Sequence, residues 1–114
     1  MKFLITMTDI DGLWEGLSPE KQEAVLSEHR AFRQALERAG KFVDALHLHP
    51  RQDAKTVRRD ATGKMTVLAG PYHQAPEYMG GCYVIEADSV EEAVDWARKG
   101  RFIEGANEVR QIWE

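Results

Sequence analysis

The fold of this chain is decided by residues 80–100, which read GGCYVIEADSVEEAVDWARKG. Residues 82–87 are rich in strand-forming side chains, and the glycine pair before them is typical of a bulge or a close backbone approach. Residues 89–92 match a capping box, in which a serine and a glutamate satisfy the first N–H groups of a helix, and Gly100 ends that helix. The stretch therefore predicts a strand followed directly by a short helix.

The flanking sequence extends this pattern in both directions. Towards the C-terminus, residues 108–113 alternate between two faces and predict a last strand. Towards the N-terminus, residues 2–8 and 41–49 show the same period of two. Between them, Ser18 begins and Gly40 ends a long amphipathic helix. The sequence thus predicts two strand–helix–strand units.

A β-hairpin is predicted between the second and third of these strands. Residues 56–59 and 65–68 flank residues 60–63, whose final glycine can supply the positive φ that a tight turn needs. Without this insertion the order is βαββαβ, that of a ferredoxin-like α+β fold with two helices on one face of an antiparallel sheet. We expect a single domain over residues 1–114, because two pieces would each be too small to bury a core.

The predicted sheet has more apolar surface than two helices can cover. Its strands at residues 2–8, 82–87 and 108–113 are substantially apolar on both faces, as in sheets that are covered twice. An identical chain is the simplest cover for the second face, and two such sheets packed together would form a dimeric α+β barrel. The sequence therefore predicts a homodimer.

Composition excludes several kinds of partner. The chain has 15 basic and 19 acidic side chains, a formal charge of −4, and its basic residues are dispersed, so we expect no nucleic acid partner. Thr6, Thr8 and Asp9 interrupt the apolar start too early for a signal sequence or a spanning helix, so we expect no membrane partner and a cytoplasmic location. Cys82 is the single cysteine, and we expect a small buried side chain there.

Residues 68–86, LAGPYHQAPEYMGGCYVIE, resemble the signature loop of the YCII-related proteins of the DGPF group. In that family the loop reads roughly Asp-Gly-Pro-Phe, then a short polar segment with Glu, then Gly-Gly and an aromatic strand. Ala69 stands here where the family has its aspartate, and Tyr72 replaces the phenylalanine. A role that depends on that aspartate is therefore not carried over to this chain.

The resemblance extends over the whole chain. Besides the opening strand, it includes residues 17–20, His29 and Phe32 in the long helix, residues 92–97 and residues 107–110. It implies a dimeric α+β barrel with a small-molecule cleft between the sheet and neighbouring loops. Some relatives are linked to dehydrochlorination of hydroxylated aromatic compounds through a His and Asp pair, and fold neighbours include muconolactone isomerases and small monooxygenases.

His29 is the first candidate for chemistry. It lies in the apolar stripe of the long helix with Val25 and Phe32, so its imidazole would face the sheet, lose part of its hydration and be suited to act as a base near neutral pH. Asp44 shares a predicted strand face with Leu46, and a buried carboxylate needs a partner. We predict a catalytic pair of His29 and Asp44; a structural histidine and a plain ion pair are the alternatives.

Other side chains are candidates for binding. Tyr72 and His73 lie in a loop rich in glycine and proline, where either could orient a carbonyl or phenol, and Tyr83 in the following strand is a third substrate-binding candidate. Packing within the loop is the alternative. His47 and His49 share a strand face and could both reach one metal ion, but no nearby motif supplies a third ligand. We therefore expect no metal and no cofactor.

Two functions fit these residues. The first is a cofactor-independent acid–base enzyme of the isomerase, lyase or dehydrochlorinase type, in which His29 transfers a proton and Asp44 orients it. The second is a non-catalytic ligand-binding or accessory module whose dimer serves regulation or assembly. The sequence has no specific nucleophile or cofactor motif that would decide between them.

Overall fold

The computed structural model describes residues 1–100 and 104–114, and these residues form the predicted succession of strands and helices. In chain order the elements are β1 (Lys2–Ile10), α1 (Pro19–Arg38), β2 (Phe42–His47), the short 3₁₀ helix η1 (Arg51–Asp53), β3 (Lys55–Arg59), β4 (Met65–Ala69), β5 (Glu77–Glu86), α2 (Val90–Lys99) and β6 (Val109–Gln111). The βαββαβ order with an inserted hairpin is confirmed. The main difference is that β5 begins at Glu77, so the glycine pair lies inside the strand.

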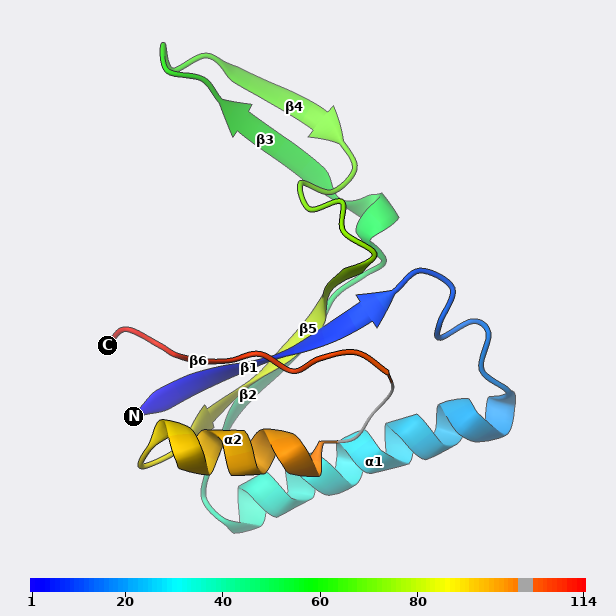
Figure 1. The fold of residues 1–114 in the computed structure, drawn as a ribbon, viewed down its shortest axis with the longest axis vertical. Helices are drawn as coiled ribbons and strands as arrows, with labels where there is room; N and C mark the ends of the chain where they lie inside the picture. The colour runs from blue at the N-terminus through cyan, green and yellow to red at the C-terminus, as the bar shows by residue number, and fades with distance from the viewer. Residues whose placement is uncertain (101–103) are drawn as a thin grey trace.

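The main sheet has four antiparallel strands in the order β2-β5-β1-β6. The two strands that follow a helix, β2 and β6, therefore lie at the edges, as in a ferredoxin-like fold. Both helices lie on the same face of this sheet, and the β3–β4 hairpin extends away from it (Figure 1). No helix in the described residues is long and apolar enough to cross a membrane.

The core lies between this sheet and the two helices. Phe3 of β1 pairs with Ile85 of β5, and both side chains are buried on the helical face. Phe32 and Leu36 of α1 and Ala93 of α2 close over them. Both helices begin as predicted, because the Ser18 hydroxyl accepts the Lys21 N–H at 3.2 Å and the Ser89 hydroxyl accepts the Glu92 N–H at 3.1 Å.

The opposite face of the sheet has an apolar centre that no described element covers. Leu4 pairs with Val84 there, and Cys82 lies between Thr6 and Leu46. Cys82 is buried, as predicted, whereas the Leu46 side chain is half exposed. We call this the open face of the sheet.

Two irregularities in strand pairing place the side chains of the site. The first is in β5, where Met7 pairs with Gly81 but Thr8 pairs with Met79, so Gly80 is the extra residue of a bulge. The second is in β2, where Phe42 pairs with Ile85 but Asp44 pairs with Val84. Because one extra residue reverses the alternation of side chains, each bulge decides which residues face the helices.

Candidate functional site

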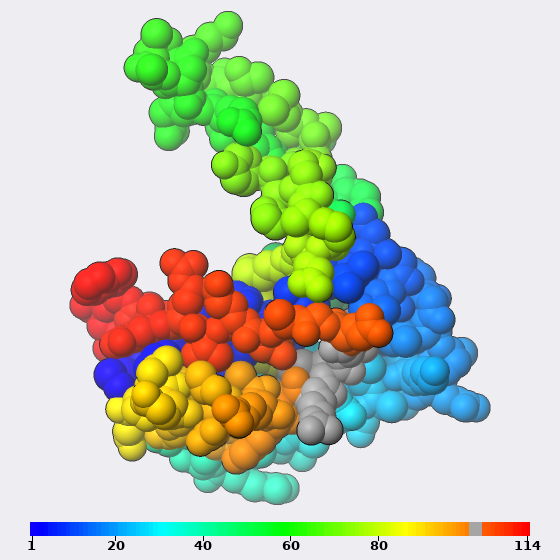
Figure 2. Space-filling view, in the orientation of Figure 1, coloured from blue at the N-terminus to red at the C-terminus, as the bar shows by residue number. Residues whose placement is uncertain are grey.

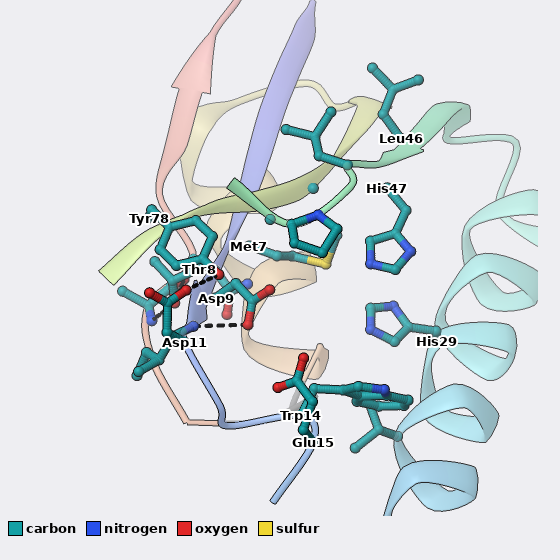
Figure 3. A pocket seen from close by; sticks show the side chains of 18 of the residues that line it. Met7, Thr8, Asp9, Asp11, Trp14, Glu15, His29, Leu46, His47 and Tyr78 are labelled. Carbon is teal, nitrogen blue, oxygen red and sulfur yellow. Dashed lines mark hydrogen bonds between the residues drawn. The ribbon is translucent and has the colours of Figure 1, made fainter. Parts of the chain in front are cut away.

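A cavity of about 530 Å³ lies beside the helical face of the sheet, a volume typical of small-molecule sites. Its walls come from α1, the end of β1 and the loop after it, the end of β2, and the bulged part of β5. Figure 3 shows side chains from these segments converging on the cavity. Segments distant in sequence therefore enclose one space.

His29 supplies the polar group on the helical wall. It projects from the same side of α1 as Val25 and Phe32, whose side chains are buried. Its Nδ1 lies 2.8 Å from the hydroxyl of Tyr83, a hydrogen bond in which either group donates according to the imidazole tautomer. The Tyr83 ring is held edge-on by Phe32, with 4.9 Å between ring centroids. The imidazole is thus anchored to the core of the sheet.

Burial sets the protonation of this pair. It lowers the pKa of His29 below the ordinary 6.5, and the charge that His47 carries when protonated lowers it further. Burial also raises the pKa of Tyr83 above the ordinary 10.0, an effect that Arg33 partly opposes. At neutral pH the site therefore holds a neutral imidazole and a protonated phenol.

His47 is the second histidine of the cavity. It pairs with Gly81 at the end of β2, on the same face as Ala45 and Tyr83. The imidazoles of His47 and His29 point toward one another from β2 and α1 (Figure 3). His49 is separated from them: its side chain is 90% exposed, and its Nδ1 lies 3.8 Å from Asp53. Among the described residues no three His, Cys, Asp or Glu side chains gather closely enough to hold a metal ion.

The rim of the cavity near the end of β1 is acidic. Asp11 accepts a hydrogen bond of 2.9 Å from the Tyr78 hydroxyl and forms an ion pair with Arg51 at 3.1 Å. These two partners lower the pKa of Asp11, while burial, followed by the bond to Asp11, raises the pKa of Tyr78 to about 12. Asp9 and Glu15 add two further carboxylates to the same lining.

Arg51 ties this rim to the loop before β5. Its guanidinium lies 4.1 Å from the centre of the Tyr78 ring and donates to the carbonyl of Ala75 at 2.6 Å. This network joins the 3₁₀ helix, the loop after β1 and β5. It therefore serves to hold the mouth of the cavity in shape.

The structure does not bring Asp44 to His29. The bulge between Phe42 and Asp44 places the carboxylate opposite Val84, on the open face, whereas Tyr83 and His29 lie on the helical face. Asp44 is exposed and accepts the N–H of Ala45 at 2.8 Å. The sequence pattern assumed a strand of unbroken alternation, so the predicted pair of His29 and Asp44 is wrong.

Of the three predicted binding residues, Tyr83 alone lines the cavity. Tyr72 is 72% exposed, and its ring lies 5.2 Å below the Arg58 guanidinium of the hairpin. His73 is exposed in the same loop, and its carbonyl accepts from Arg51. The loop's aromatic side chains therefore lie away from the two histidines.

The family model of the YCII-related domain matches residues 1–114. The chain belongs to the YCII-related family. An uncharacterised protein of Rhizobium meliloti (strain 1021) is 30% identical over 98 residues, which cover 86% of this chain and 78% of that protein. Neither the family description nor the name of this relative specifies a reaction. The chemistry of this YCII-related chain must be argued from its cavity.

The sequence pattern did not place His47 beside His29 in this YCII-related chain. It grouped His47 with His49 by their spacing, whereas the fold groups it with His29. The one signal in the sequence was the glycine pair before Cys82, which predicted a close approach of strands. The partner strand at Gly81 is β2, and His47 is the residue opposite.

Proposed function

We propose that this YCII-related chain is an enzyme that transfers a proton within a small molecule, with His29 as the base. The observation that carries the proposal is a neutral, hydrogen-bonded imidazole in the wall of a cavity, facing a second histidine. A base whose pKa lies somewhat below the working pH is available at each encounter with substrate. In this proposal Tyr83, and not Asp44, orients the imidazole of His29.

The hydrogen bond to Tyr83 fits a tautomer of His29 that can act as a base. When Nδ1–H donates to the Tyr83 oxygen, Nε2 is the nitrogen that accepts a proton. The substrate C–H or O–H bond breaks, its proton passes to Nε2, and the electron pair is delocalised into the substrate. In an isomerisation the proton then returns to another atom of the same substrate, so no oxidant or reductant is consumed. His47 provides a second proton-exchange group in the same cavity.

The walls indicate the kind of substrate. Trp14, Met7 and Val25 give an apolar lining beside the two histidines. An aromatic or other ring compound with a weakly acidic C–H or O–H bond fits such a lining. The chemistry available to these side chains is that of acid–base isomerases and lyases, which require no further group.

The pH dependence of turnover tests this proposal. With a substrate found by screening weakly acidic ring compounds, we expect kcat/KM to be constant at neutral pH and to fall below pH 6.5, because protonation of His29 removes the base. Replacing His47 by glutamine removes a nearby positive charge and should move this fall to higher pH. Two results would contradict the proposed mechanism. One is a ligand that raises the melting temperature but is not converted to product; the other is a fall in kcat/KM at the same pH in His47→Gln as in the native chain.

We also propose that the open face packs against a second copy of the chain. Its apolar centre, formed by Leu4, Val84 and Leu46, supports this pairing, since sheets with two apolar faces are ordinarily covered on both. Analytical ultracentrifugation should give a mass of twice 13.0 kDa at micromolar concentration. A sedimenting species of 13.0 kDa at that concentration would contradict the proposed dimer.

A further inference from the structure

We infer that the β3–β4 hairpin is an arm that packs against the second copy of this chain, an inference that rests on the homodimer proposed above. Figure 2 shows the hairpin projecting from the rest of the molecule. The surface of the hairpin is separate from the open face, because β3 and β4 form their own two-stranded sheet outside the ferredoxin-like one. Its surface and charge indicate what it contacts.

One face of the hairpin carries exposed apolar side chains, flanked by Lys55 and Arg59. Val57 pairs with Val67, and Arg59 pairs with Met65, so the side chains of Val57, Val67 and Met65 share one face. Their exposed fractions are 60%, 66% and 60%. A contiguous apolar group of this kind is typical of a surface that is covered in the assembled protein.

The hairpin receives little support from its own chain. Among the described elements, β3 and β4 share extensive contacts with each other and with no other strand or helix. Its base is held by the Gly70 N–H, which donates to the Ala54 carbonyl at 2.8 Å. A two-stranded hairpin is only marginally stable in water without a third strand or another packing surface. The apolar face therefore needs a partner surface.

Charge favours a second copy as that partner. Residues 55–69 contain four basic side chains and one acidic side chain, Asp60, a formal charge of +3. The whole chain carries −4, so the remaining residues carry −7 together. A basic arm and an acidic body on one chain attract each other across a homodimer, because each copy offers both.

The direction of the hairpin agrees with this partner. It leaves the sheet on the side away from both helices, which is the side of the open face (Figure 1). Strands of five residues extend about 17 Å, whereas packed sheets lie about 10 Å apart. An arm of this length reaches past the sheet of a copy that covers the open face.

A pair of charge variants on one strand tests the arm. Val67→Glu places a carboxylate on the apolar face, and Thr66→Glu places the same charge on the opposite face of β4. Both side chains are exposed in the single chain, so both variants should fold, which far-ultraviolet circular dichroism would verify. We expect Val67→Glu to raise the dimer Kd by at least about 10-fold, since a carboxylate in an apolar contact is desolvated, and Thr66→Glu to leave it within about 2-fold.

The outcomes separate the arm from the dimer. A wild-type chain that sediments as a monomer overturns the homodimer and the arm with it. A wild-type dimer whose Kd is the same in both variants overturns the arm alone. Equal weakening by both variants also overturns it, because the effect would then follow net charge and not the apolar face.

Discussion

Replacing His29 by glutamine should lower kcat by about 10²–10⁴-fold, the usual contribution of a positioned general base. The glutamine amide can still form a hydrogen bond with the Tyr83 hydroxyl, which lies 2.8 Å from Nδ1 in the native chain. It takes up no proton near neutral pH, so the reaction loses its base while the cavity keeps its shape. Steady-state kinetics on the substrate found by screening would measure the loss.

A tyrosine variant provides the matched comparison. Tyr83→Phe keeps the ring that packs against Phe32 and removes only the hydroxyl that orients the imidazole. The loss of one hydrogen bond is worth about 1–1.5 kcal/mol, so kcat should fall about 10-fold, far less than in His29→Gln. Substrate affinity, followed by thermal shift, should be retained in both variants. Unchanged turnover in His29→Gln would exclude His29 as the base.

The architecture could be predicted from sequence because its signals are local. The hydroxyls of Ser18 and Ser89 each accept a backbone N–H group three residues further along, so each serine caps the helix that it precedes. The period of two in residues 2–8 and the glycine at the hairpin turn also act over a few residues. Such signals do not depend on tertiary contacts, which is why the predicted order of elements is confirmed.

The site could be predicted only in part because it depends on strand register. His29 was found from the stripe of α1, a periodicity that tertiary contacts do not alter. The side of β2 on which Asp44 and His47 lie depends instead on a bulge after Phe42, and nothing in the local sequence announces it. One extra residue exchanged the roles of these two side chains.

Replacing Gly81 by alanine should lower the free energy of unfolding by about 3 kcal/mol, the upper part of the range for overpacked interiors. A Cβ at this position would lie 2.5 Å from the Leu46 carbonyl oxygen and 3.2 Å from the Met7 side chain. The oxygen belongs to the backbone of β2, so the strand itself must move. Chemical denaturation at a fixed protein concentration would measure the change.

Gly63→Ala separates this crowding from the ordinary strain of losing a glycine. Gly63 has φ +87° in the hairpin turn, and a Cβ there would meet nothing within 4 Å, so its cost of about 1 kcal/mol is backbone strain alone. If Gly81→Ala is as stable as Gly63→Ala, or more stable, then the close approach of β5 and β2 does not require a glycine at position 81.

The same approach of the two strands places His47 opposite Gly81. A crowded Gly81 should therefore displace His47, and the pKa of His29, followed by NMR, should rise toward 6.5 as that charge moves away.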